Sequence, residues 1–159
     1  MDYTYLNATI RSIAPLASTD PNFTLSGEVL PGDSLALSPK NKVSSTTTYT
    51  LPFDEHIGKI SVSATFTHTD KQRTSYTYND PATLAAFGTD LGILAPRNLL
   101  DLNLNWNEVA QKPFDLSMFA TNVTDQHYYS FVPGLGGYGL ETAVLGQPRM
   151  FGGRIRYHF

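Results

Sequence analysis

Four histidines are the side chains best suited to acid–base chemistry or metal binding, and their positions argue against both. His56, His68, His127 and His158 lie on different segments, with no metal-ligand spacing between them. The chain has no cysteine, which removes disulfides, zinc–thiolate sites and thiol nucleophiles. No Ser/His/Asp set and no pair of carboxylates can be located from spacing alone. We therefore expect no catalytic residue, no metal site and no cofactor, and we predict that the protein is not an enzyme.

Two further motif matches have simpler explanations than chemistry. The stretch Gly134 to Gly139 formally fits a dinucleotide-binding fingerprint, but loop and strand follow it, where that fingerprint requires a helix. We interpret it as a flexible loop. Three Asn-x-Ser/Thr triplets begin at Asn7, Asn22 and Asn122, and two of them lie in or beside predicted strands. We do not expect these to be glycosylation sites.

The elements that hold these residues are predicted to be β-strands, because polar and apolar residues alternate along six stretches. The ranges are Asp2–Arg11, Lys42–Leu51, Ile57–Thr67 with a continuation toward Tyr76, Leu100–Asn107, Phe114–Val123 and Met150–Phe159. The fourth stretch is the clearest, with Leu100, Leu102, Leu104 and Trp106 on one face and Asp101, Asn103, Asn105 and Asn107 on the other. Tyr3 and Tyr5 make the inner face of the first strand ambiguous, and Phe119 interrupts the polar face of the fifth.

Strand length and loop length both favour a membrane barrel. Most of the predicted strands have about ten residues, which is the length that crosses a bilayer at a tilt, whereas strands of globular proteins cluster near 5 to 6. The connections alternate between long and short. The long ones are 12–41, 70–96 and 124–148, and the short ones are 52–56 and 108–112. Long external loops and short periplasmic turns produce this alternation. The 16% share of charged residues is also below the usual 25%.

The last ten residues form an amphipathic strand that ends on an aromatic residue. Phe151, Gly153, Ile155, Tyr157 and Phe159 share one face, and Arg154, Arg156 and His158 share the other. Chain ends usually fray into water, so a terminal phenylalanine on an apolar strand face indicates an apolar medium. At the end with short turns, Tyr157, Trp106 and Phe114 would then join an interfacial aromatic girdle.

The chain resembles the C-terminal part of a TonB-dependent outer-membrane receptor. The resemblance rests on Asn122-Val-Thr-Asp125 with His127-Tyr128-Tyr129, on Gly146-Gln-Pro148-Arg149-Met-Phe151-Gly152, and weakly on Pro39 to Pro52. It implies an all-β fold, an antiparallel meander of about six long transmembrane strands from a barrel of the 22-strand type. Residues 1–159 would be a C-terminal fragment without plug domain, TonB box or signal peptide.

The resemblance also implies a function and its partners. The intact parent would take up a scarce nutrient such as a siderophore–iron complex across the cell outer membrane, and this segment alone would not transport. The expected partners are outer-membrane lipid, the barrel-assembly machinery through the C-terminal strand, and the TonB energy-coupling complex in the intact parent; no nucleic-acid partner is expected.

Two groups of site residues follow from the resemblance. The first group makes up the family motif and the assembly signal, and its members are Asn122, Asp125, Tyr129, Pro148, Arg149, Phe151, Gly152, Tyr157 and Phe159. Amphipathic aromatics in the last long loop, which are Tyr128, Phe131 and Tyr138, are candidates for ligand contact because they combine a large contact area with polar groups.

Two alternatives stay open from the residues alone. A soluble β-sandwich that serves as a binding or adhesin module alternates in the same way. An autonomous small outer-membrane barrel is the other, although single-chain barrels begin at about 8 strands and six strands leave two edges of unpaired amides.

Overall fold

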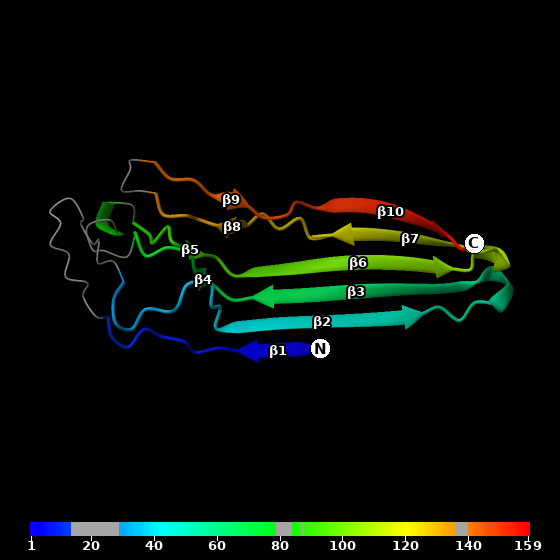
Figure 1. The fold of residues 1–159 in the computed structure, drawn as a ribbon, viewed down its shortest axis with the longest axis horizontal. Helices are drawn as coiled ribbons and strands as arrows, with labels where there is room; N and C mark the ends of the chain where they lie inside the picture. Colours follow the sequence, from blue (N-terminus) through cyan, green and yellow to red (C-terminus); the bar gives the residue numbers. More distant parts are fainter. Residues whose placement is uncertain (14–28, 79–83, 87, 136–139) are drawn as a thin grey trace.

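The computed structural model describes residues 1–13, 29–78, 84–86, 88–135 and 140–159. Its main element is an antiparallel six-stranded sheet with the strand order β1-β2-β3-β6-β7-β10. The strands are β1 (Asp2–Tyr5), β2 (Asn41–Thr50), β3 (Lys59–Thr69), β6 (Arg97–Asn107), β7 (Phe114–Thr121) and β10 (Met150–Tyr157). Each strand lies beside the next strand of this series (Figure 1). The prediction of an all-β antiparallel meander is confirmed.

Smaller elements occupy the two ends of the sheet. The two-stranded ladders β4 (Gln72–Arg73) with β5 (Ile93–Leu94), and β8 (Tyr129–Phe131) with β9 (Val144–Leu145), lie at the end that carries the long connections. At the opposite end, each of the two short turns contains a single 3-10 turn, η1 (Glu55–Ile57) and η2 (Val109–Gln111). The alternation of long and short connections is therefore confirmed, and the two kinds lie at opposite ends of the sheet (Figure 1).

Some predicted strand limits were wrong. The first strand ends at Tyr5, and beyond it the pairing is irregular, with an isolated bridge between Thr9 and Ser34 and a few further backbone bonds. The third strand ends at Thr69: Asp70 still bonds Asn41 of the neighbouring segment, and the short β4 follows as a separate element. The remaining limits differ by a few residues at the ends, where flanking turns compete with the ladder.

Cross-strand register places apolar residues opposite one another over the whole sheet. One row of partners runs Tyr49, Val62, Leu104, Met118 and Gly153, and the next runs Thr47, Ala64, Leu102, Ala120 and Phe151. Because side chains of paired residues lie on the same side of a sheet, these rows form one continuous surface. We call it the apolar face.

The opposite surface, which we call the polar face, is built from hydroxyl, amide and charged side chains. One row of partners runs Thr48, Ser63, Asn103, Phe119 and Gly152. Thr48 bonds Ser63 across the strands at 3.0 Å, and Thr46 bonds Thr65 at 2.9 Å. Cross-strand hydroxyl pairs of this kind stabilise a sheet by a few tenths of a kcal/mol, up to about 1 kcal/mol.

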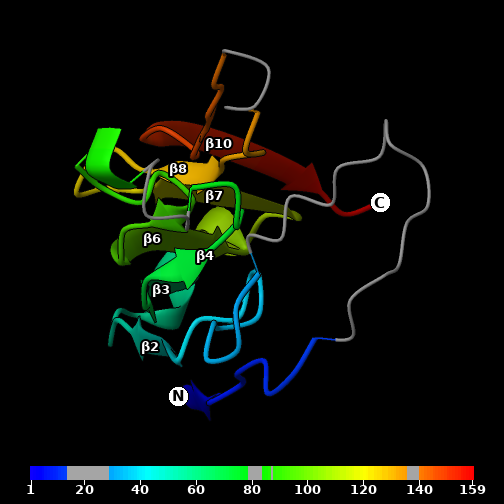
Figure 2. The same cartoon turned by 90° about the vertical axis from the view of Figure 1, so that its left-hand side faces the viewer.

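The sheet is a single layer. Seen from the end with long connections, β2, β3, β6, β7 and β10 follow one another in one curved sheet (Figure 2). Within the described ranges, no second sheet covers the apolar face, and large side chains there are exposed, including Ile155 at 76%, Phe151 at 71% and Met118 at 64%. Of the described buried apolar residues, Tyr78, Leu94 and Val132 belong to the long connections, and Val109 belongs to a short turn.

The two short turns are joined to each other. The indole Nε1–H of Trp106 donates to the Ile57 carbonyl oxygen at 2.8 Å, and Gln111 Nε2 lies 2.9 Å from His56 Nδ1. Gly58 has a φ of 95°, and a Cβ there would lie 2.5 Å from the Glu108 carbonyl oxygen. Glycine is therefore required where the turns approach each other.

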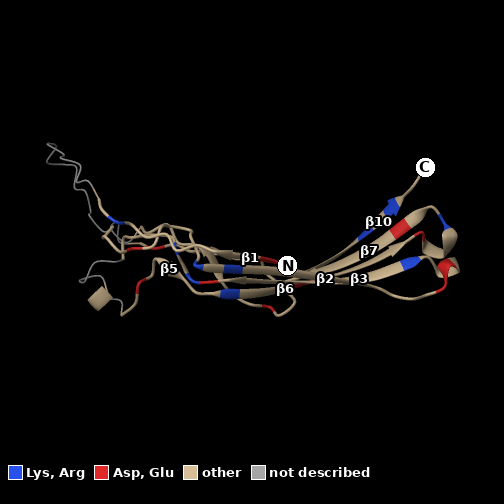
Figure 3. Cartoon of the chain, turned by 90° about the horizontal axis from the view of Figure 1, so that it is seen from below, with Lys and Arg blue, Asp and Glu red and all other residues tan. Residues whose placement is uncertain are grey.

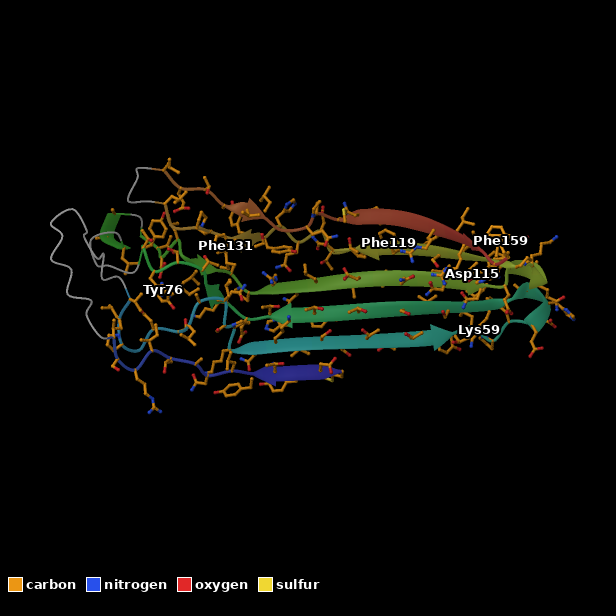
Figure 4. The ribbon with its side chains drawn as sticks, viewed as in Figure 1. Lys59, Tyr76, Asp115, Phe119, Phe131 and Phe159 are labelled. Carbon is orange, nitrogen blue, oxygen red and sulfur yellow. The ribbon has the colours of Figure 1, made fainter. Side chains whose placement is uncertain are left out.

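Phe119 is explained by its partner on the last strand. Its ring lies over Gly152, where an added Cβ would come within 2.3 Å of a ring carbon. Figure 4 shows Phe119 on β7, away from both ends of the sheet. The missing side chain at Gly152 thus leaves space for an aromatic ring on the polar face.

Substitution at the two adjacent glycines of β10 tests this contact. Gly152→Ala should destabilise the sheet by about 1 to 2 kcal/mol, because the new methyl group displaces the Phe119 ring. Gly153→Ala is the matched control, since the nearest atom, the Ser117 carbonyl oxygen, would be 3.6 Å away. Urea unfolding followed by the fluorescence of Trp106, the single tryptophan, measures both. In a Phe119→Ala background, Gly152→Ala should no longer lower the free energy of unfolding. An undiminished loss of stability would show that the Phe119 ring is not its cause.

Candidate functional site: the apolar face, its boundaries and the loop cluster

The apolar face has a polar boundary at the end with long connections. The Tyr3 hydroxyl donates to Asn41 Oδ1 at 2.8 Å, and the Asn41 backbone and side-chain N–H groups both donate to Asp70. His68 lies between Asp70 and Asn98, at 3.2 and 2.6 Å. The bonds from Asn41, followed by that from His68, hold the pKa of Asp70 below its usual value. A fixed ionised carboxylate therefore marks where the apolar face ends.

The other boundary, beside the short turns, is aromatic. Tyr157 is the register partner of Phe114, and Ile60 is that of Trp106, so these residues share the apolar face near one end. The Tyr157 and Phe159 rings meet edge to face with centroids 5.0 Å apart. His158 Nε2 lies 2.8 Å from Asp115 Oδ2, and the backbone N–H of His158 donates to the Pro113 carbonyl oxygen. The last strand is thus anchored to β7, and Phe159 lies near the short turns (Figure 4).

Asn122 organises the exit from β7. It is 3% exposed and has a φ of 48°, in the left-handed region that asparagine tolerates better than most residues. Its side-chain amide donates to the carbonyl oxygens of Gln126 and Gln147, and its Oδ1 accepts from the Gln126 N–H at 2.9 Å. Its own N–H donates to Asp101 Oδ1 on β6. One buried side chain therefore ties the turn after β7 to the segment that enters β10.

The other motif residues surround Asn122 with weaker contacts. Asp125 pairs with Arg149 at 3.3 Å, and both side chains are more than 40% exposed, so the pair contributes at most about 1 kcal/mol. Pro148 is exposed on the approach to β10. Phe151 and Gly152 are the second and third residues of that strand and lie on opposite faces. The structure thus brings Asn122, Asp125 and Arg149 together, and places Tyr157 and Phe159 at the far end of the sheet.

Tyr128 links three segments at the end with long connections. The Arg97 guanidinium lies over its ring, 5.2 Å from the centroid, and its hydroxyl oxygen accepts from the Gln147 N–H. The Gly146 N–H donates to the Tyr128 carbonyl oxygen at 2.8 Å, and a Cβ at Gly146 would lie 2.2 Å from the ring. Tyr128 therefore has a packing role that does not depend on a ligand.

A groove of about 710 Å³ lies between the second and third long connections. Its lining includes Leu94, Pro96, Tyr128, Tyr129, Val132 and Glu141. Of the residues predicted to contact a ligand, Tyr128 lines it. Phe131 does not line it, although it lies at the same end of the molecule (Figure 4). Tyr138 lies outside the described residues. Ligand contact by these three side chains stays a prediction.

A buried ion pair holds the second long connection together. Arg73 Nη1 lies 2.8 Å from Asp90 Oδ2, with side chains 8% and 13% exposed, and also donates to the Ser75 carbonyl oxygen. Its guanidinium lies over the Tyr76 ring, whose hydroxyl donates to the Ser34 carbonyl oxygen at 2.8 Å. The Thr77 hydroxyl donates to the Gly134 carbonyl oxygen at 3.2 Å. The three long connections are therefore bonded to one another.

Sequence reasoning missed most of these partners. Asp90, Gln126 and Gln147 stand in irregular segments, where polarity without periodicity gives no signal. Arg73 and Arg97 stand at strand ends, where alternation does not identify a side-chain partner. The buried role of Asn122 could have been suspected, since asparagine favours turns that need a positive φ. Over the described ranges, no group of three or more His, Cys, Asp or Glu side chains could hold a metal ion, and no helix there is long and apolar enough to cross a membrane.

Comparison with known proteins shows a shared fold. No protein-family model matches the sequence, and neither does any curated protein. Among solved structures, the chain resembles the ferric yersiniabactin uptake receptor FyuA from Yersinia pestis, with a TM-score of 0.64 and 13% sequence identity. The match covers 83% of this chain and 18% of that chain. The six-stranded meander is thus similar to a section of a much longer transport receptor.

Substitutions of Asn122 separate its hydrogen bonds from its backbone conformation. Asn122→Ala should lower the free energy of unfolding by about 2 to 4 kcal/mol, because it leaves partly buried backbone groups of Gln126 and Gln147 unpaired. Asn122→Gly should recover about 1 kcal/mol of this loss, since glycine has no penalty at positive φ. Urea unfolding measures both, with the exposed Asn7→Ala as control. Full stability in Asn122→Gly would mean that only the backbone conformation matters.

Proposed function

We propose that this chain is a C-terminal segment of a TonB-dependent outer-membrane receptor that takes up a scarce nutrient, such as a siderophore–iron complex. One observation carries the proposal: a single-layer sheet exposes a continuous apolar face, and its opposite face is polar. In a receptor barrel, the apolar face contacts lipid and the polar face lines the lumen. The likeness to a ferric yersiniabactin uptake receptor supports the same conclusion.

The resemblance to TonB-dependent receptors implies the partners in this proposal. Outer-membrane lipid covers the apolar face, and the aromatic residues near the short turns lie at the periplasmic boundary. The last strand, with Tyr157 and Phe159, is recognised by the barrel-assembly machinery. The loop cluster lies outside the cell, where Tyr128, Phe131 and Tyr138 are near the nutrient. The TonB complex acts on the intact receptor, and the plug domain and further strands belong to other parts of that protein.

The two alternatives fit the observed sheet less well. A β-sandwich buries the apolar face of one sheet against a second sheet, and no second layer is present in the part of the chain that the structure describes. A closed small barrel pairs its first and last strands, whereas β1 and β10 are the two ends of the strand order here. Both edges of the sheet therefore need further strands in a membrane, where each unpaired backbone group costs several kcal/mol.

Quenching of Trp106 in detergent tests the proposal. The purified chain should remain in solution only with detergent, and a brominated detergent should quench Trp106, which lies on the apolar face. A control with Trp106→Phe and Asn105→Trp moves the tryptophan to the polar face and should be quenched much less. A monomer that is soluble without detergent would identify a soluble module instead, and ion conductance by this chain alone would identify an autonomous barrel.

Adjacent arginine substitutions test which face contacts lipid. In the membrane-embedded receptor, Leu102→Arg should lower the free energy of unfolding by about 2 to 4 kcal/mol, because it places a charge in the middle of the lipid-facing band. Asn103→Arg changes the neighbouring residue on the polar face and should be tolerated. Reversible urea unfolding in lipid vesicles gives both values, and equal losses would contradict the assignment of the two faces.

A further inference from the structure

Basic side chains gather on the polar face near the short turns. Register places Arg154 opposite Ser117 and Arg156 opposite Asp115 on β7, and Ser117 in turn opposite Asn105 on β6. Lys59, the first residue of β3, is the register partner of Asn107, the last residue of β6. Asn107 lies on the same face as Asn105. Figure 3 shows basic residues on β10 and β3 and an acidic residue on β7 near this end, where Figure 4 labels Lys59 and Asp115.

These residues enclose a small polar cavity. Its volume is about 150 Å³, and its lining consists of Asn105, Asn107, Asp115, Ser117, Arg154 and Arg156. Every lining side chain is polar or charged, in contrast to the apolar groove between the long connections. The space exceeds the roughly 30 Å³ that one water molecule occupies in the liquid. It can therefore hold a small polyatomic group.

Asp115 is the one acidic residue in the lining, and hydrogen bonds from other groups hold its carboxylate. Its Oδ1 accepts from the Glu108 N–H at 3.0 Å, and its Oδ2 lies 2.8 Å from His158 Nε2. Both oxygens are thus occupied by groups at the short-turn end of the sheet. Neither the Arg154 nor the Arg156 side chain forms a close ion pair or hydrogen bond within the described residues, although the charge of Arg156 acts on Asp115 at longer range. Residues i and i+2 of a strand lie about 7 Å apart on the same face, so the two guanidinium groups are neighbours.

We propose that Arg154 and Arg156 form a binding site for an oxyanion, with the amides of Asn105 and Asn107 and the Ser117 hydroxyl as further donors. A guanidinium presents two parallel N–H groups that match the oxygens of a carboxylate or phosphate. Two such groups on one strand face, with Lys59 nearby, attract negative charge more strongly than Asp115 repels it. The site stands on local geometry and does not depend on what the whole protein transports.

The oxyanion group that binds to the two arginines can come from two sources. A free anion such as inorganic phosphate can enter the cavity, or the carboxylate of a polypeptide segment that lies against the polar face can occupy it. Both place oxygen atoms between the two guanidinium groups. The size of the cavity fits either a single phosphate or one carboxylate side chain, so the two sources are separated by experiment.

Titration of the complete chain in detergent micelles tests the site. The arginine Nε–Hε resonances are followed by NMR while inorganic phosphate is added, and in a second series a capped Gly-Glu-Gly peptide. We expect saturable shifts of the Arg154 and Arg156 resonances. Arg154→Gln and Arg156→Gln should each weaken binding about tenfold, because each removes a bidentate donor. Arg149→Gln is the matched control, since Arg149 immediately precedes β10, far from the cavity, and pairs with Asp125.

Asp115→Asn gives a change in the opposite direction. It keeps an acceptor for the Glu108 N–H and removes the one negative charge in the lining, so phosphate should bind severalfold more tightly. Tighter binding of phosphate than of the peptide assigns a free anion as the occupant, and the reverse order assigns a polypeptide carboxylate. Shifts that do not saturate, or that are equal at all six arginines, would reflect general ionic screening and would overturn the proposal.

Discussion

The whole structure depends on an apolar sheet face that the described part of the chain cannot bury. Backbone pairing fixes five long strands side by side, and the register aligns their apolar residues into continuous rows. A soluble protein of this size would place a second layer against such a surface, since apolar burial is the main favourable term in folding. Here the buried side chains lie mostly beyond the end of the sheet. The sheet therefore requires an apolar medium or further protein, and the loops have a small core of their own.

That division explains why the two ends differ. The loop cluster uses directed bonds rather than apolar volume: the Arg73–Asp90 pair at 2.8 Å and the four hydrogen bonds around Asn122. Such bonds fix irregular backbone that has no ladder to satisfy it. The short-turn end needs little of this, because two tight turns and the Trp106 and His158 bonds suffice.

Periodicity made the sheet predictable and left the loops unpredictable. The alternation from Leu100 to Asn107 fixed both the strand and its two faces, because side chains of a strand point to opposite sides in turn. The predicted first strand extended beyond Tyr5 because Leu6, Ala8 and Ile10 alternate with polar residues as in a strand. In the structure, the chain there pairs irregularly with 33–35 and Lys40. Phe119 could be noted as an exception from the sequence. Its cause, Gly152, lies 33 residues away and needed the register.

The motif residues show the same limit. Their spacing indicated a receptor, but it could not show that Asn122 bonds Gln147 or that Tyr128 packs against Gly146, since both contacts join residues far apart within one irregular connection. Composition likewise gave no sign that both carboxylate oxygens of Asp115 are hydrogen-bonded to other groups, or that no close ion pair joins it to the arginines of β10.

The unequal connections also have a kinetic consequence. The short turns join β2 to β3 and β6 to β7, so each pair can form as a local hairpin, on a timescale of about 1 to 10 μs for such units. Bringing the hairpins together closes the segment 70–96, and adding β10 closes 122–149, each at a larger entropic cost. The bond between His56 and Gln111 joins the tips of the two hairpins. It can form as soon as they meet, and it would favour the native register of β3 and β6 before their strands are fully paired.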